Sequence, residues 1–267
     1  MTFRCDFETV APHTVKLKLN QIRKMRTKTL LIAAAALAFG LATSQAQVYS
    51  QNVVGYVNVP LTNGVFSVVA PTLDLDGTGV NNTVSTVFTT PAIGDIVYVF
   101  NGTGYDTLSY IVEGSGHPVV YVTNWFNGSG NVASGYSINP GVSVFYLPAA
   151  NETATLVGNV LQSTNLVNTY FPAAGHFQLL SSKAPISGGL TSVLGYTPTI
   201  GDNVYIYDNG HYDIYSYIVE GSGHPVTYTT NWFNGAGAVQ EPVINVGQGF
   251  WMLPAGSSSW SQNFIVQ

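Results

Sequence analysis

Short runs of alternating apolar and polar residues, separated by glycine-rich turns, dominate the chain from residue 47 onward. The runs are rich in Val, Tyr, Phe, Ile and Thr, as in VVGYVNV at 53–59, DIVYVF at 95–100 and VVYVTNWF at 119–126. A period of two is typical of half-buried strands, and Asn-Gly and Gly-Ser-Gly sequences are typical of tight turns. No amphipathic helical stretch of useful length appears, so the sequence predicts an all-β protein.

The strand pattern occurs twice. Residues 105–128 and 212–235 differ at only four of 24 positions, and matching segments continue on both sides. The period is much longer than the roughly 20–50 residues of a solenoid repeat, so it indicates duplication of a domain. We predict two tandem β-sandwich-like domains, 47–160 and 161–267, packed as a pseudo-twofold pair.

Two of the four differences indicate which face of a duplicated strand is buried. Val120 and Val122 are replaced by threonines in the second copy, whereas the alternate positions Val119, Tyr121 and Thr123 are kept. Because alternate side chains of a strand point to opposite faces, this pattern predicts a fixed core face and a variable outer face.

The N-terminal residues have the features of an export signal. Residues 25–46 contain basic residues, a short apolar run and a small-x-small cleavage sequence at 44–46, which is typical of a secretory signal peptide. The apolar run is too short for a membrane anchor. We therefore expect residues 1–24 to be an upstream mis-start segment. We also expect the mature protein to begin near Gln47, to be secreted or held at the cell surface, and to have no transmembrane anchor.

Removal of this segment changes the charge. Beyond residue 46 the chain keeps one of its eight Lys and Arg residues, Lys183, and eleven of its thirteen acidic residues. Nucleic-acid binding requires cations that neutralise phosphates, so this acidic composition excludes it. The single cysteine, Cys5, is also removed, and we expect an exported protein without disulfide bonds.

The duplicated segment contains a carboxylate and an imidazole in each copy. Glu113 and His117, and likewise Glu220 and His224, are four residues apart, a combination suited to ligand binding, metal binding or acid–base work. The intervening glycines and the following proline predict a loop, where this spacing does not bring the two side chains together. The alternative is a glycine turn between two strands with solvated polar side chains.

Two aspartates indicate a possible calcium site. Asp74 and Asp76 are followed by glycines and asparagines, and such oxygen-rich loops suit Ca²⁺. An EF-hand loop starting at Asp74 would require Glu at its twelfth position, where Ser85 stands. The alternatives are a calcium site of another kind and an acidic turn; no other cofactor is expected.

Aromatic residues beside turns provide candidates for carbohydrate binding. Trp125 with Asn127, and Trp232 with Asn234, stand where a strand meets an Asn-Gly turn. Indole faces and neutral amides suit a neutral glycan, and such a site predicts exposed, coplanar aromatics in both copies. The alternative is a core role, because tryptophan is usually largely buried.

Paired carboxylates would be needed for a secreted hydrolase. Asp106, Glu113, Asp213 and Glu220 are available, and a glycosidase would hold two of them about 5–10 Å apart in one cleft. Neither a cysteine nor a Gly-x-Ser-x-Gly sequence is present in the mature chain, which disfavours nucleophilic catalysis by these groups.

Several segments resemble a group of secreted bacterial tandem β-repeat proteins. These are QVYSQNVVGYVNV at 47–59, GDIVYVFNGTGYD at 94–106 and GQGFW at 247–251, whereas the first copy has a different sequence after Gly141. The group has no established activity, so the resemblance implies export and a β-fold only.

Three functional classes follow from these observations. The leading hypothesis is a non-catalytic extracellular protein with a structural or adhesive role, whose partner is another extracellular protein or itself. The alternatives are a neutral-glycan-binding module that uses loop aromatics and a secreted hydrolase with paired carboxylates.

Overall fold

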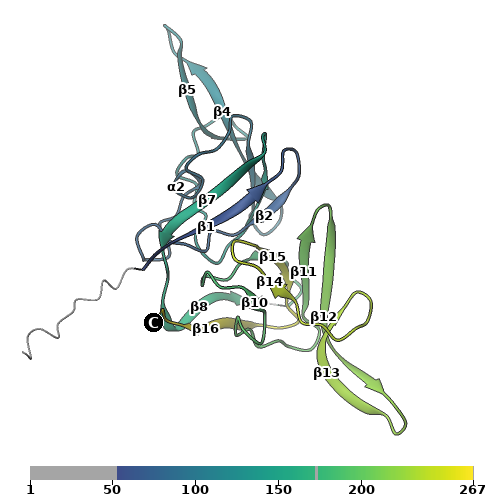
Figure 1. The fold of residues 1–267 in the computed structure, drawn as a ribbon. Helices are drawn as coiled ribbons and strands as arrows, with labels where there is room; N and C mark the ends of the chain where they lie inside the picture. The colour runs from purple at the N-terminus through teal and green to yellow at the C-terminus, as the bar shows by residue number, and fades with distance from the viewer. Residues whose placement is uncertain (1–52, 172–173, 267) are drawn as a thin grey trace, which may run out of the picture. The chain divides into compact units, whose positions relative to one another are not determined.

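The computed structural model describes residues 53–171 and 174–266 (Figure 1). These residues belong to one compact unit and consist largely of antiparallel strands, which confirms the all-β prediction. The predicted upstream segment and signal peptide lie outside the described residues. None of the helices within the described ranges is long and apolar enough to cross a membrane.

The first repeat is built around a five-stranded sheet. Its elements are β1 (Val54–Leu61), β2 (Ser67–Val69), α2 (Val84–Val87), β3 (Ile96–Phe100), β4 (Tyr105–Ser115), β5 (Val120–Asn127), β6 (Val144–Leu147) and β7 (Glu152–Asn159). The sheet has the order β2-β6-β3-β4-β5, and β1 pairs separately with β7. The short helix α2 has a Thr83 capping box and was not foreseen from the sequence pattern.

The second repeat has an equivalent five-stranded sheet and an equivalent outer strand pair, together with a short β10–β14 pair in place of a helix. Its elements are β8 (Ser163–Phe171), β9 (Gln178–Leu180), β10 (Gly188–Gly189), β11 (Asn203–Asp208), β12 (His211–Ser222), β13 (Thr227–Asn234), β14 (Val243–Ile244), β15 (Phe250–Leu253) and β16 (Ser258–Phe264). The sheet order β13-β12-β11-β15-β9 matches that of the first repeat, and β16 pairs with β8 as β7 pairs with β1. The predicted boundary at 160/161 falls between β7 and β8. The division into two β-sandwich-like domains stays a prediction.

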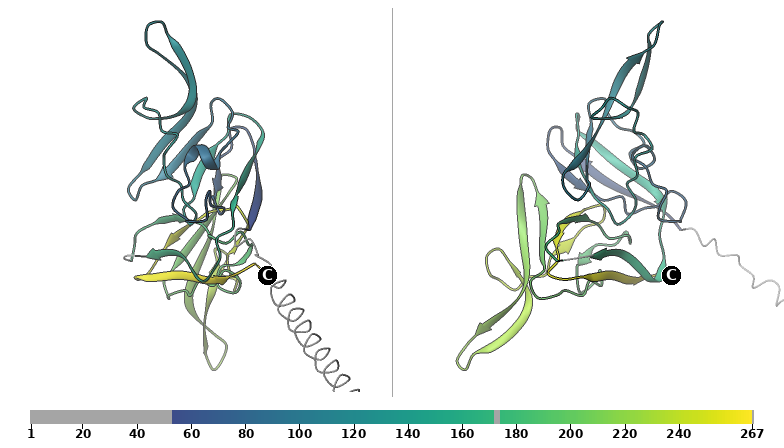
Figure 2. Two further views of the ribbon diagram at one scale, coloured as in Figure 1. Left: turned by 90° about the vertical axis from the view of Figure 1, so that its left-hand side faces the viewer. Right: turned by 180° about the vertical axis from the view of Figure 1, so that it is seen from behind.

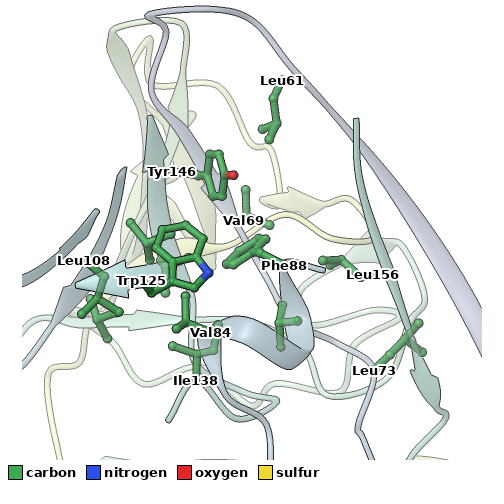
Figure 3. Close-up of a cluster of buried hydrophobic side chains, with 14 of the residues drawn as sticks. Leu61, Val69, Leu73, Val84, Phe88, Leu108, Trp125, Ile138, Tyr146 and Leu156 are labelled. Carbon is green, nitrogen blue, oxygen red and sulfur yellow. The ribbon is translucent and has the colours of Figure 1, made fainter. Parts of the chain in front are cut away.

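Each repeat has its own buried core between the sheet and the separate strand pair. Figure 3 shows the first core, in which Trp125 lies among Val84, Phe88, Ile138 and Tyr146. The second core contains Trp232 and Trp260. Alternation explains the burial: the valines of β3 face the core, whereas the aromatic residues between them face the other way.

The two repeats exchange edge contacts reciprocally. The backbone N–H of Ala70, beyond β2, donates to the carbonyl of Gly247 at 2.9 Å, and the N–H of Ser181, beyond β9, donates to that of Gly141 at 3.1 Å. Ala70 corresponds to Ser181, and Gly247 corresponds to Gly141. The first hydrogen bond is donated by the first repeat to the second, and the other by the second repeat to the first. A third apolar cluster fills the space between the sheets and consists of Val68, Phe145, Leu179 and Trp251. The two repeats thus contact one another through matching positions of their edges, whereas a duplication of whole domains stays a prediction.

The duplicated segment forms a hairpin arm in each repeat, and its predicted core face is wrong. In the far half of the β4–β5 hairpin every residue from 112 to 123 is exposed, including Tyr121 at 74% and the whole face assigned to the core. Figure 2 shows the far halves of both hairpins extending away from their own sheets. Both faces of this part of the hairpin are exposed, so the alternating pattern did not identify a buried face.

Candidate ligand-binding cleft

An aromatic cleft lies where the two repeats meet. Its volume is about 430 Å³, which is within the usual range for a small-molecule or glycan site. The lining consists of Phe100, Tyr105, Phe177, Tyr205, Tyr212 and Trp251. All six residues are aromatic and none carries a formal charge. The repeats thus build together a site that neither completes alone.

The strand period places these rings. In β3 the valines Val97 and Val99 are buried in the first core, so Phe100 projects from the opposite face of the sheet. The same alternation in β11 turns Tyr205 away from the second core. Because the outward faces of both sheets meet, aromatic residues from distant parts of the chain become neighbours.

The rings form a box around Trp251. The planes of Phe100, Tyr105 and Phe177 stand at 80°, 82° and 86° to the indole, at centroid distances of 4.7, 6.5 and 5.9 Å. Trp251 itself is only 9% exposed, whereas Tyr105, Phe177 and Tyr212 are 45%, 44% and 43% exposed. The buried indole therefore holds the outer rings in place, and the outer rings are available to a ligand. Phe100 and Tyr105 are inclined at 64° to one another, so these two rings do not form a flat platform.

Two tyrosine hydroxyls of the cleft, those of Tyr105 and Tyr212, stay neutral at physiological pH. Burial, and next the neighbouring Tyr212, raise the pKa of Tyr105 above its ordinary value. Burial likewise raises the pKa of Tyr212. Since both hydroxyls remain protonated, each keeps a hydrogen-bond donor in an otherwise apolar site, and the Tyr212 oxygen accepts a hydrogen bond from the indole of Trp251.

A more polar groove adjoins the aromatic cleft and shares Phe100 and Phe177 with it. Its volume is about 390 Å³. The polar residues that line it are Asn139, Asn168, Thr169, Gln178 and Lys183. The two cavities together offer a longer site that is apolar at one end and polar at the other.

The predicted tryptophan platform is wrong in this structure. Trp125 is 1% exposed and Trp232 is 4% exposed, so neither ring has a face available to a sugar. Trp125 packs against Tyr110 with a centroid distance of 5.3 Å, and Trp232 packs against Tyr217 at the same distance. Both indoles stabilise the cores of their repeats, which was the alternative role.

The asparagines beside these tryptophans hold turns. The side-chain oxygen of Asn127 accepts the backbone N–H groups of Ser129 and Asn131, both at 3.0 Å. Asn234 makes the equivalent contacts in the second copy at the same distance. With these oxygens engaged by the turn, the asparagines have a structural role that the prediction of ligand binding did not include.

The glutamates and histidines of the duplicated segment lie on the exposed arms, far from any core. Glu113 is opposite Val122 in the strand register, and Glu220 is opposite Thr229. His117 Nδ1 contacts the carbonyl oxygen of Gly116 at 2.7 Å, and His224 makes the same contact with Gly223. The two members of each pair are not hydrogen-bonded to one another among the described contacts. Glu113 and Glu220 lie on strands β4 and β12, and not in the loop that the sequence predicted.

The aspartates of the predicted calcium loop form an acidic turn. Asp74 is fully buried, and one of its oxygens accepts the N–H of Gly77 at 2.5 Å. The carboxylate of exposed Asp76 accepts hydrogen bonds from Thr78 and Asn81, and the first of these contributes most to lowering its pKa to about 2. Within the described residues no three His, Cys, Asp or Glu side chains gather at one point. Calcium binding stays a prediction.

The carboxylates considered for hydrolysis do not line the aromatic cleft. Glu113 and Glu220 are on the arms, and Asp213 lies 3.8 Å from His211 in an exposed pair. Asp106 accepts hydrogen bonds from the hydroxyl of Tyr136 and the amide of Asn101. A reaction that uses these groups stays a hypothesis.

The Asp106–Tyr136 contact predicts a pH effect. The hydrogen bond from Tyr136, followed by that from Asn101, lowers the pKa of Asp106, and burial, followed by this contact, raises the pKa of Tyr136 to about 12. A lowered carboxyl pKa stabilises the fold above the unfolded-state value of about 3.9, and this contribution is lost as the pH falls through the folded-state value. We expect Tyr136→Phe to raise the Asp106 pKa and to cost stability at pH 7 but not at low pH.

Carboxyl NMR titration and urea unfolding at both pH values test this expectation. Tyr121→Phe is the control, because Tyr121 is exposed on an arm. An unchanged Asp106 titration in Tyr136→Phe would contradict the assigned role of the hydroxyl.

None of the six cleft residues was singled out from the sequence as a binding residue. A signal was nevertheless present, because Tyr98 and Phe100 alternate with valines in β3, and tyrosines occupy the equivalent positions of β11. An aromatic row on the face opposite the core indicates a second packing surface or a site. The pairing of the two rows depends on the association of the repeats, which the alternation does not specify.

Comparisons with protein-family models, curated proteins and solved structures gave no match. The functional argument therefore rests on the residues of this chain.

Proposed function

We propose that this chain is an exported, non-catalytic extracellular or cell-surface protein that adheres to neutral glycans through the aromatic cleft. The observation that supports the proposal is an open cleft whose lining is entirely aromatic and comes from both repeats. The apolar faces of sugar rings pack on such side chains, and the tyrosine hydroxyls at the rim suit sugar hydroxyls. The signal peptide predicted from the sequence agrees with an extracellular ligand.

Titration calorimetry with xylohexaose, cellohexaose and mannohexaose tests the proposal. We expect saturable binding of at least one oligosaccharide, and Tyr212→Ala and Phe177→Ala should each raise its Kd about tenfold through the loss of one stacking surface. Both rings are about half exposed, so the variants should remain folded.

Tyr121→Ala is the matched control, because it removes an exposed aromatic ring from an arm, outside the cleft. Its affinity should equal that of the unmodified protein. Failure of all three oligosaccharides to bind would overturn the proposal, as would equal losses in the arm and cleft variants.

A structural role is the second candidate, and the exposed arms favour it. Val119 and Tyr121 in one arm, and Val226 and Tyr228 in the other, are all more than half exposed. Strands β5 and β13 are also the outer strands of their sheets, and unpaired strand edges associate readily. Sedimentation equilibrium that detects self-association, lost in a Tyr121→Lys/Tyr228→Lys variant, would support this role.

A further inference from the structure

The groove beside the aromatic cleft contains a lone cation. Lys183 lines this groove and is the only lysine or arginine in the described residues. It is partly buried, and burial lowers its pKa from the ordinary value. The only ion pair found in the described ranges joins His211 to Asp213, so the ammonium of Lys183 has no carboxylate partner there. A partly desolvated charge without a counter-ion is costly.

Both repeats position this lysine. Its backbone N–H donates to the side-chain oxygen of Asn168 at 2.6 Å. Its aliphatic part crosses Gly141 of the first repeat so closely that a Cβ at Gly141 would lie 2.8 Å from the Lys183 Cε. Gly141 also has a φ of +97°, which favours glycine. The side chain is thereby directed along the groove wall.

The fold itself does not require a cation at this position. The segment FQLLSSK at 177–183 corresponds to FSVVAPT at 66–72, so Thr72 is the first-repeat equivalent of Lys183. Thr72 is 2% exposed, which shows that the same backbone segment is built with a buried neutral side chain. The positive charge of Lys183 is therefore not needed to form the backbone structure that the two repeats share.

We infer that the groove beside the aromatic cleft binds a carboxylate carried by the glycan, with Lys183 as its counter-ion. The inference rests on the proposed glycan-binding function and specifies its ligand class. An ammonium–carboxylate hydrogen bond is among the strong polar contacts, particularly where water is partly excluded. Sugar rings occupy the aromatic end, and a uronic acid unit occupies the polar end.

The charge of the whole protein limits how acidic the glycan is. Eleven acidic residues and one lysine follow residue 46, so a densely charged polyuronate is repelled. Interactions between exposed charges are screened beyond about 8 Å at physiological salt, whereas a contact in the groove is not. The preferred ligand is accordingly a mainly neutral glycan with an isolated uronic acid.

Calorimetry of matched oligosaccharide pairs tests this inference. Each of the three neutral hexaoses is compared with the same hexaose carrying one glucuronic acid unit, against the full mature chain and Lys183→Met, which keeps most of the aliphatic packing. We expect the acidic member of one pair to bind about tenfold more tightly than its neutral partner, and Lys183→Met to abolish the difference. Lys183→Arg keeps the charge and should retain part of the preference.

The outcomes separate the inference from the proposed function. Equal affinity for both members of every pair, or an acid preference that survives in Lys183→Met, would overturn the role of Lys183 and leave glycan binding in the cleft intact. No binding of any neutral or acidic hexaose would overturn both. Thermal unfolding of Lys183→Met is the control for folding. An unchanged midpoint would show that the lost preference for the acidic hexaose results from the lost charge.

Discussion

Trp125→Ala is expected to lower the free energy of unfolding by about 3–5 kcal/mol, the usual range for truncation of a buried tryptophan. The indole is 1% exposed and lies against Tyr110 and Phe88, with ring centroids at 5.3 and 6.4 Å. Its removal leaves a cavity that β-strands on both sides of the core cannot close. Urea unfolding followed by circular dichroism measures the loss.

The second repeat provides a matched variant. Trp232→Ala should cost at least as much, because Trp232 also donates a hydrogen bond from Nε1 to Thr191 Oγ1 at 2.9 Å. Tyr121→Ala is the control, since a ring that is 74% exposed should change stability by no more than about 0.5 kcal/mol. Similar midpoints for the tryptophan variants and the control would contradict the core assignment.

Asp202→Asn should destabilise the protein by about 2–4 kcal/mol, although it changes only one atom of the side chain. The Asp202 carboxylate is 1% exposed and accepts hydrogen bonds from the hydroxyl of Tyr196 and the N–H of Thr199, both at 2.6 Å, and from the N–H of Ala255 at 2.8 Å. An asparagine presents an NH₂ donor to at least one of these donors. Two donors facing one another inside the protein lose their hydrogen bonds without replacement.

Asp95 has the same role in the first repeat. It accepts from Tyr146 and from the N–H groups of Ala92 and Ala149, so Asp95→Asn should give a loss similar to that of Asp202→Asn. Asp208→Asn is the matched control on an exposed strand end. Equal stability of the control and the two buried variants would show that these carboxylates do not organise their loops.

The tyrosines that serve these carboxylates come from different elements. Tyr146 lies on β6, whereas its equivalent in the second repeat is Met252, and Tyr196 from the loop before β11 supplies the hydroxyl there. In both repeats the carboxylate raises the pKa of its tyrosine beyond the effect of burial, so the hydroxyl stays a donor. Each buried carboxylate therefore accepts a hydrogen bond from a tyrosine hydroxyl, but the tyrosine comes from a strand in the first repeat and from a loop in the second.

Alternation and turn residues were sufficient to predict the all-β class and the turn between the strands of each arm, whereas the order of the strands in each sheet was not predicted. The burial of the arm could not be predicted in the same way. Val119 and Tyr121 are identical in both copies, which indicates that this face of the strand makes contacts. A buried core face and an exposed contact surface produce the same alternation in the sequence. Only the position of the arm relative to the other strands distinguishes the two.

The cleft was beyond prediction for a related reason. Phe100 and Trp251 are far apart in the sequence. Their ring centroids lie 4.7 Å apart only because the edges of the two sheets are hydrogen-bonded to one another. Local pattern determines which face a ring occupies, whereas the association of two sheets determines which ring it meets. The Tyr146 partner of Asp95 was not predictable from local pattern either, because it is 51 residues away along the chain and reaches Asp95 through the pairing of β3 with β6 inside the first repeat.

The reciprocal contact between the repeats also has a consequence for symmetry. If two identical chains paired through the same edges, every substitution would appear on both sides of the symmetry axis. Two repeats within one chain are free of that constraint. Trp251 occupies the position that Phe145 has in the first repeat, and Lys183 that of Thr72. The chain can therefore build an asymmetric site with distinct ends, which a homodimer of single repeats could not encode.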